Sequence, residues 1–178
     1  MATKFGFLAM ASKQKMENLA EQVGAALKAH GYMLATAESC TGGGVAQTVT
    51  DIAGSSTWFE RGFITYSNQA KQEMLGVEKN TLEQFGAVSE TTVREMIAGA
   101  LRHSAADIAL AVSGIAGPGG GTTEKPVGLV WFAWGIKNKT CVAQRHHLTG
   151  NRAEIRAQSV SIALRGVLEM LAQDSKIA

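Results

Sequence analysis

The sequence predicts an α/β fold, a three-layer α/β/α sandwich around a mixed, mostly parallel sheet of about five strands. Helical and strand-like patterns alternate along the chain, which is typical of parallel strands joined by helices. Residues 107–113 (DIALAVS) form a continuous apolar run, as expected of a strand that helices cover on both faces. Two strand-like segments, 127–136 and 140–147, flank a KNK turn and predict an antiparallel hairpin, which makes the sheet mixed.

The first half of the chain supplies two strands and the helices around them. Residues 12–30 carry apolar side chains at helical spacing and predict an amphipathic helix. Residues 32–38 are short and apolar and predict a buried strand. A short helix is expected over 42–50, after a run of glycines. A second strand is expected over 57–67, where aromatic and β-branched residues concentrate, with one or two helical turns over 68–75.

The second half continues the alternation. A helix opens at Ser89, and its apolar stripe contains Val93, Met96, Ile97, Ala100 and Leu101. The strand of 107–113 runs into GIAGPGGGTTEKP, a loop with five glycines. After the hairpin, a last helix is expected to begin at Asn151. We therefore expect one domain over 12–178. It is preceded by a flexible arm over 1–11, whose apolar run is at the short limit for a signal peptide.

Composition and charge narrow the class of protein. Of the 178 residues, 46% are hydrophobic and 18% charged, which favours one packed core over disorder. The net charge of +2 gives no broad attraction to nucleic acid or to anionic membranes, and no apolar run approaches the ~20 residues of a membrane span. Cys40 and Cys141 are far apart and fit two reduced thiols. We expect a cytoplasmic protein that binds neither nucleic acid nor membrane.

Three loops follow the predicted strands and converge on one edge of the sheet. They read TAESCTGGG from residue 36, TYSNQAK from residue 65 and SGIAGPGGG from residue 113. Ligands of open α/β sheets bind outside the carboxyl ends of the strands, so these loops are the candidate site. Glycines let backbone N–H groups approach an anion, and the candidates are Gly42, Gly43, Gly119 and Gly120. The same glycines could equally form only turns.

The corner TAESCTGG presents three possible nucleophiles in succession. Ser39, Cys40 and Thr41 alternate in direction as the strand ends, so all three cannot face a ligand. Cys40 is expected to be a small buried residue, and Thr41 to cap the following helix.

The histidines offer no base for such a nucleophile. They are His30 and His103, near predicted helix ends, and the adjacent His146 and His147, which point to opposite faces of a strand. We therefore assign no metal site and no Ser-His-Asp triad.

A lysine can replace the histidine if its pKa falls far enough. Free lysine titrates near 10.4, so only about one in 2,500 is neutral at pH 7. Lowering the pKa to roughly 7.5 requires about 4 kcal/mol of desolvation or repulsion. Lys71 follows the second strand and is the best-placed candidate, although it could instead be a solvated surface lysine. Tyr66 could orient groups at the site or simply pack in the core.

Six segments together resemble the C-terminal domain of the CinA (competence/damage-inducible) family. They are TAESCTGG at 36–43, GSS at 54–56, TYSNQAK at 65–71, GAVSE at 86–90, SGIAGPGGGTTEKPVG at 113–128 and GNR at 150–152. The likeness runs in order from about residue 12 to the C-terminus. Larger family members also carry a molybdopterin-binding-like domain, and this chain resembles the stand-alone form.

The resemblance implies hydrolysis of nicotinamide mononucleotide to nicotinate mononucleotide and ammonia, in pyridine nucleotide salvage. It implies Ser39 as nucleophile, with Lys71 and Tyr66 as catalytic partners, and no cofactor. It also implies that Arg152 contacts the substrate phosphate. The other residues expected to bind substrate are Ser56, Ser113, Thr41, Gly42, Gly43, Gly119 and Gly120. The N–H groups from Cys40 to Gly43 are expected oxyanion donors. We expect a homo-oligomer that acts on a small nucleotide.

Two other readings stay open from the sequence. One is a catalytically silent module that binds a pyridine nucleotide or ADP-ribose and keeps the glycine loops and Arg152. The other is a thiol hydrolase based on Cys40, which lacks a histidine partner. The order of preference among mononucleotide, riboside and free nicotinamide is also open.

Overall fold

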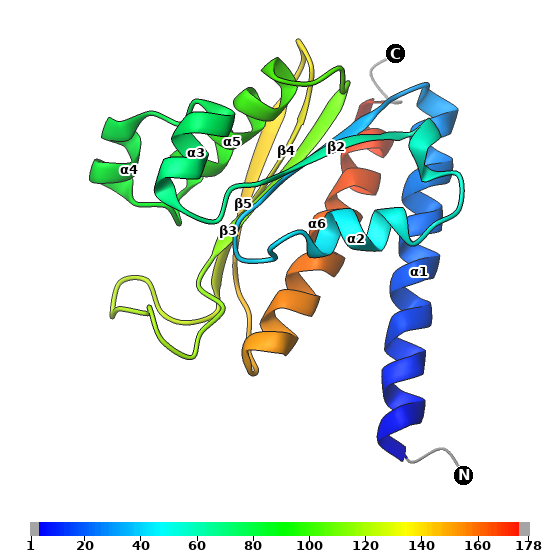
Figure 1. The fold of residues 1–178 in the computed structure, drawn as a ribbon, viewed down its shortest axis with the longest axis horizontal. Coiled ribbons are helices and arrows are strands. Elements are labelled where there is room, and N and C mark those ends of the chain that lie inside the picture. Colours follow the sequence, from blue (N-terminus) through cyan, green and yellow to red (C-terminus); the bar gives the residue numbers. More distant parts are fainter. Residues whose placement is uncertain (1–3, 175–178) are drawn as a thin grey trace.

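The computed structural model describes the backbone of residues 4–174 and the side chains of residues 13–174. A five-stranded sheet lies between two groups of helices, with α3, α4 and α5 on one face and α1, α2 and α6 on the other (Figure 1). The predicted three-layer α/β/α architecture is confirmed. The elements are α1 (Lys4–His30), β1 (Leu34–Glu38), α2 (Gly44–Thr50), η1 (Ser55–Thr57), β2 (Phe59–Ile64), α3 (Asn68–Leu75), α4 (Lys79–Phe85), α5 (Glu90–Arg102), β3 (Ile108–Gly114), β4 (Leu129–Ile136), β5 (Cys141–His147) and α6 (Arg152–Asp174).

The strands are ordered β2-β1-β3-β4-β5 across the sheet. β1 pairs in parallel with both β2 and β3, and β4 is antiparallel to both β3 and β5. Four strands therefore run in one direction and only β4 opposes them, which confirms the mixed, mostly parallel sheet. Asn138, in the predicted KNK turn between β4 and β5, adopts a φ of 60°. Asparagine tolerates this left-handed conformation better than most residues do, which suits it to a tight hairpin.

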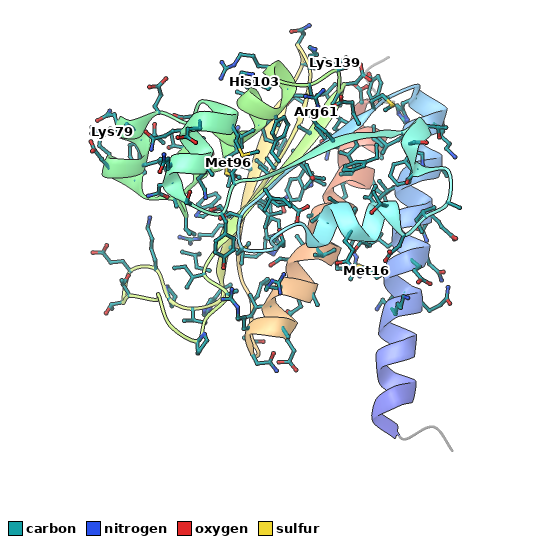
Figure 2. The ribbon with its side chains drawn as sticks, in the orientation of Figure 1. Met16, Arg61, Lys79, Met96, His103 and Lys139 are labelled. Carbon is teal, nitrogen blue, oxygen red and sulfur yellow. The ribbon has the colours of Figure 1, made fainter. Side chains whose placement is uncertain are left out.

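Two apolar cores, one on each face of the sheet, hold the layers together. Side chains fill the space between the sheet and the helices (Figure 2). On the side of α5, Met96 is fully buried among alanines of β1 and β3. These small side chains let α5 pack close to the strands. On the other side, larger residues such as Leu34 and Phe132 pack against α1 and α6. Alternate residues of each strand enter opposite cores, as the period of two requires.

Helix α6 begins with a reciprocal capping arrangement. The Asn151 side chain accepts hydrogen bonds from the N–H groups of Ala153 and Glu154, at 2.9 and 3.1 Å. The Glu154 carboxylate in turn accepts from the Asn151 N–H at 2.8 Å. Such a capping box satisfies N–H groups that the first helical turn leaves free. It confirms the predicted start of this helix and fixes the orientation of its first turns.

Two parts of the helical prediction were wrong. Helix α1 begins at Lys4, not at residue 12, since residues 4–11 contain good helix formers and no proline. Whether residues 1–11 form a flexible arm stays a prediction, and residues 1–3 lie outside the described part. Helix α4 was missed because KNTLEQF offers little apolar periodicity. Instead the Thr81 hydroxyl donates to the Glu95 carboxylate at 2.6 Å, which ties α4 to α5.

None of the helices described is long and apolar enough to cross a lipid bilayer.

Candidate active site

Ser39 and Lys71 form a buried pair at the carboxyl edge of the sheet. The Ser39 N–H donates to the Val112 carbonyl at 2.9 Å and so continues the pairing of β1 with β3 past the last residue of β1. By strand alternation the Ser39 side chain lies on the same face as Ala37, the face that α3 and α5 cover. There Lys71, in the first turn of α3, places its Nζ 3.0 Å from Ser39 Oγ. The structure brings the predicted nucleophile and base into direct contact.

Burial changes the protonation of Lys71. Its side chain is 1% exposed, and that of Ser39 is 8% exposed. Besides Ser39, the Lys71 amine contacts only the Thr65 carbonyl, at 2.8 Å, and no carboxylate of the described residues pairs with it. Desolvation by burial therefore lowers the pKa of Lys71 to about 8. About one molecule in ten then carries the neutral amine at pH 7, a far larger share than for free lysine.

Burial makes the Cys40 thiol less reactive. It is buried, which confirms the expectation of a small packed residue. Burial raises the pKa of the thiol to about 11, although the charges of Lys71 and Arg156 oppose this. A thiol with this pKa is almost entirely protonated at neutral pH, and only the thiolate is a strong nucleophile. The burial and protonation of the thiol thus favour Ser39 over Cys40 as the candidate nucleophile.

The turn after Ser39 depends on two glycines and one carboxylate. Gly42 and Gly43 have φ values of 59° and 92°, in the left-handed region that glycine tolerates best. The fully buried Glu38 carboxylate accepts hydrogen bonds from the N–H groups of Val45 and Ala46, at 3.0 and 2.8 Å. A negative charge at this position stabilises the amino end of α2. The carboxylate thereby anchors α2 to the residue that precedes Ser39.

The prediction that Thr41 caps α2 was wrong. Its hydroxyl is buried and has no hydrogen-bond partner among the described residues. Glu38 performs the capping from the end of β1. The capping role of Glu38 was not predicted, because this residue ends a strand and several residues separate it from Gly44, where α2 begins. An acidic residue between a predicted strand and a predicted helix was the available signal.

A cavity of about 220 Å³ opens beside the Ser39–Lys71 pair. Its walls include Ser39, Lys71, Tyr66, Ser113 and Arg152. It adjoins a wider hollow of about 680 Å³, and Ala116 and Arg152 belong to both. The hollow lies between the loop after β3 and the first turns of α6, where its wall includes Gly117, Asn151 and Arg156. The site therefore has a small cavity beside the Ser39–Lys71 pair and a larger, more open hollow next to it.

Comparisons with known proteins show the family of this chain. The family model described as "CinA C-terminal domain" matches residues 16–171. The chain belongs to the CinA family. It is 52% identical over 161 residues to an Escherichia coli K12 protein named nicotinamide-nucleotide amidohydrolase PncC, covering 90% of this chain and 98% of that protein. A Pseudomonas putida protein of the same name is 46% identical over 152 residues, covering 85% and 94%.

Solved structures of the CinA family share the fold. The crystal structure of the competence/damage inducible protein CihA from Agrobacterium tumefaciens superposes with a TM-score of 0.84. The two chains are 47% identical, and the match covers 88% of this chain and 95% of that one. A CinA superfamily protein from Klebsiella pneumoniae gives a TM-score of 0.86 at 41% identity, covering 89% and 98%.

Tyr66 lies in the cavity wall, but its hydroxyl does not reach the reactive pair. Its side chain is 59% exposed, and the hydroxyl accepts a hydrogen bond from Arg152 Nη2 at 2.9 Å. Among the described residues, neither Ser39 nor Lys71 bonds to it. The other branch of Arg152 donates from Nη1 to the Gly117 carbonyl at 2.8 Å. Tyr66 is therefore tied to the predicted phosphate contact, and its role as a partner of Lys71 stays a prediction.

Ser113 lies in the cavity wall, but two of the predicted glycines of the loop after β3 do not. Ser113 lines the cavity, and its hydroxyl donates to the Ala87 carbonyl at 2.7 Å, which holds the loop before α5 against the site. In the loop after β3, Gly117 lines the hollow, whereas Gly119 and Gly120 are exposed farther along and are absent from both cavity walls. Their predicted contact with substrate stays a prediction.

Ser56 is the predicted site residue that the structure places elsewhere. It is exposed in η1, immediately before the amino end of β2. Ser39 follows the carboxyl end of β1, and the two strands are parallel. The length of the sheet therefore separates Ser56 from Ser39 within one chain, and the cavity of the chain does not include Ser56. A loop that precedes a parallel strand lies at the opposite edge from one that follows it, and the prediction overlooked this.

Arg156 contacts the nucleophile turn and was not predicted. It donates from Nε to the Cys40 carbonyl at 3.1 Å and from Nη2 to the Thr41 carbonyl at 2.7 Å. It lies four residues after Arg152, so both side chains extend from the same face of α6. That spacing places Arg156 beside Arg152 but does not specify its contact with the turn after Ser39.

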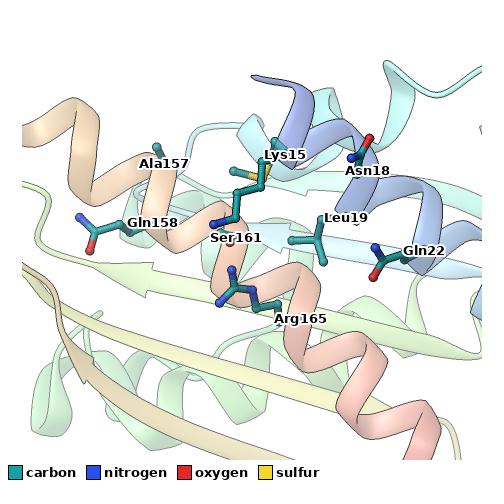
Figure 3. Close-up of a pocket in the computed structure, with 9 residues that line it drawn as sticks. Lys15, Asn18, Leu19, Gln22, Ala157, Gln158, Ser161 and Arg165 are labelled. Atoms are coloured by element: carbon teal, nitrogen blue, oxygen red, sulfur yellow. The ribbon is translucent and has the colours of Figure 1, made fainter. Parts of the chain in front are cut away.

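A separate groove of about 470 Å³ lies between α1 and α6, with Lys15 and Arg165 on either side of it (Figure 3). None of the Ser39 site residues lines it. Over the described residues, no cluster of three or more His, Cys, Asp or Glu side chains could hold a metal ion. The Ser39–Lys71 cavity is therefore the candidate for chemistry.

Proposed function

We propose that this chain is a nicotinamide-nucleotide amidohydrolase that uses Ser39 as nucleophile and Lys71 as general base. Relatives that bear this name are about half identical in sequence to this chain, and the match covers nearly the whole length of each relative. The observation that carries the assignment of residues is the contact of 3.0 Å between Ser39 Oγ and Lys71 Nζ, both buried. A buried lysine that is partly neutral at pH 7 can accept the serine proton as its oxygen attacks.

The reaction follows as two displacements at the carboxamide carbon. Neutral Lys71 takes the Ser39 proton while Oγ bonds to the carbon, whose electrophilicity the cationic pyridinium ring increases. The resulting Lys71 ammonium returns the proton to the departing amine, and ammonia leaves. A water molecule, deprotonated by Lys71, then attacks the ester carbon. The bond from this carbon to Ser39 Oγ breaks, the Lys71 ammonium returns the proton to Oγ, and nicotinate mononucleotide is released. Each step moves one proton through one amine, so no metal or organic cofactor is needed.

The oxyanion of each tetrahedral intermediate requires N–H donors near Ser39. The expected set ran from Cys40 to Gly43, and one member needs correction because the Gly42 N–H donates to the Ser39 carbonyl at 3.0 Å. The N–H groups of Cys40, Thr41 and Gly43 have no acceptor from another residue in the described part of the chain. One such donor contributes about 3–4 kcal/mol in other acyl-transfer enzymes.

The two cavities match the two ends of the substrate. The pyridinium carboxamide fits the small cavity beside Ser39, and the ribose phosphate extends into the hollow beside Arg152. Tyr66 then acts in substrate binding, because its hydroxyl is hydrogen-bonded to Arg152 and not to Lys71. We further expect a cytoplasmic homo-oligomer in pyridine nucleotide salvage, acting on a small nucleotide and not on nucleic acid.

Ammonia release from a panel of nicotinamide compounds tests the proposed function. Wild type should release ammonia from the mononucleotide faster than from the riboside or free nicotinamide. Ser39→Ala should release none while still binding the mononucleotide in calorimetry. If wild type binds the mononucleotide or ADP-ribose with no turnover, the chain is a silent binding module. If Ser39→Ala keeps activity and Cys40→Ala loses it, the nucleophile is the thiol.

A further inference from the structure

The guanidinium of Arg156 holds the Cys40–Thr41 and Thr41–Gly42 peptide groups, in the turn that follows Ser39. Its bonds to the Cys40 and Thr41 carbonyls come from one planar group and reach from α6 across to the end of β1. Arg156 is half-buried, and no carboxylate of the described residues pairs with it. Its charge therefore acts on the backbone of the turn.

The N–H groups of these two peptides differ in what they contact. In a planar trans peptide the C=O and the following N–H point in opposite directions. The Thr41 carbonyl faces Arg156, and the N–H across that peptide, on Gly42, donates to the Ser39 carbonyl. A chain of two hydrogen bonds thus links the guanidinium to the backbone of the nucleophile. Hydrogen bonds in such chains polarise and strengthen one another.

The other peptide group has an unused donor. The Cys40 carbonyl faces Arg156, so the Thr41 N–H is directed away from the guanidinium and finds no acceptor in the described part of the chain. A cation bound to the carbonyl polarises the peptide and makes its N–H a stronger donor. This N–H belongs to the second residue after Ser39, and both Ser39 and Cys40 line the cavity.

We propose that Arg156 is a positioning residue for acyl transfer, and this inference rests on the proposed function. It fixes the Cys40–Thr41 peptide so that its N–H donates to the oxyanion, and it holds Ser39 in place through the Thr41–Gly42 peptide. Arg152, one helical turn earlier, contacts neither peptide and faces Tyr66 and Gly117 instead. The two arginines on this face of α6 thus have different proposed roles. Arg152 binds the substrate, and Arg156 positions the turn after Ser39.

The test compares Arg156→Ala with wild type, using Arg165→Ala as the matched control from the same helix. Removing an oxyanion donor outright lowers kcat about 10²–10³-fold. Loss of its support should lower kcat roughly ten- to hundred-fold and change KM by less than about threefold. Arg156→Lys should be intermediate, because an ammonium is a point charge that cannot match the planar fork. Arg165→Ala should behave as wild type.

A fluorophosphonate probe gives a readout that does not depend on the natural substrate. Ser39 Oγ attacks its phosphorus, fluoride leaves, and the phosphoryl oxygen occupies the oxyanion position. Arg156→Ala should slow this labelling, followed by mass spectrometry, by a factor similar to the loss in kcat. Wild type that labels at Ser39 without deamidating any nicotinamide nucleotide would contradict the proposed function, and the labelling rates alone would then decide the inference.

Three results would overturn the inference. One is a kcat and a labelling rate for Arg156→Ala within about twofold of wild type. Another is a raised KM with kcat unchanged, which would make Arg156 a substrate contact. The third is an unchanged kcat in Arg156→Lys. This variant replaces Arg156→Ala as the test if thermal melts show that Arg156→Ala is unfolded at the assay temperature.

Discussion

The guanidinium of Arg152 donates a hydrogen bond to the hydroxyl of Tyr66 at 2.9 Å, which joins α6 to the loop between β2 and α3. The two residues are 86 positions apart in the sequence. Because Arg152 also holds the Gly117 carbonyl, one side chain connects the start of α6 with two loops, at the boundary between the small cavity beside Ser39 and the hollow. A substrate that reaches from one cavity to the other must pass this side chain.

Arg152→Ala should weaken binding of the mononucleotide far more than that of the riboside. A charge-assisted contact to phosphate is worth about 1.5–3 kcal/mol, so KM for the mononucleotide should rise about ten- to hundred-fold. The riboside lacks the phosphate and provides the internal control. Steady-state kinetics on both compounds measure the difference, and equal losses would place Arg152 away from the phosphate.

Tyr66→Phe separates two roles for the tyrosine. If its hydroxyl acts through Arg152, the loss of one hydrogen bond from a charged donor, about 1.5–3 kcal/mol, should raise KM for the mononucleotide by at most about ten- to hundredfold. The pH dependence of kcat should stay as in wild type. A fall in kcat of more than about a hundredfold would instead identify Tyr66 as a proton-transfer partner of Lys71.

Elements with local signals were predictable from the sequence. Helix α3 occupies the predicted residues, because the Ser67 side chain caps its start by accepting from the Ala70 N–H, and Gly76 ends it. Helix α5 likewise starts after Ser89, whose hydroxyl accepts from the Thr92 N–H. Topology predicted that the corner containing Ser39 and the loop before Lys71 meet at one edge of the sheet, because each follows a strand whose carboxyl end lies there. The choice of Ser39 and Lys71 as nucleophile and base came from the resemblance to the CinA family.

Contacts that depend on tertiary packing were not predictable in this way. Arg156 reaches the turn after Ser39 only because α6 packs across the end of β1, and nothing near either residue in the sequence specifies that packing. The link from Tyr66 to Arg152 has the same origin. Ser56 differs, because its position before a parallel strand already indicated the opposite edge of the sheet.

The depressed pKa of Lys71 should also appear in the pH dependence of stability. The unfolded lysine titrates near 10.4, and the pKa of about 8 in the folded protein lies below this value. Between these two values the unfolded state binds more protons, so the contribution of Lys71 to stability rises with pH across this window. As pH falls through the folded pKa that contribution is lost, by an amount on the order of 3 kcal/mol.

Urea unfolding of wild type and Lys71→Met at pH 7 to 10.5 measures this contribution. The free energy of unfolding of wild type minus that of Lys71→Met should rise with pH above about 8 and be flat below it. Lys137→Met, at an exposed turn lysine, is the matched control for loss of a lysine charge. A difference for Lys71→Met that does not change with pH would mean that its amine titrates normally in the folded protein.

The central claim is that a partly neutral Lys71 activates Ser39, and the pH profile of kcat/KM for the mononucleotide tests it most directly. In wild type, kcat/KM should rise with pH through an apparent pKa of about 8, as the free enzyme loses the Lys71 proton. Lys71→Arg should be nearly as inactive as Lys71→Ala, because the pKa of a guanidinium lies so far above neutral pH that no neutral form is present to accept a proton. A wild-type profile flat from pH 6 to 9 with chemistry rate-limiting, or a Lys71→Arg enzyme with most of its kcat/KM, would contradict the account.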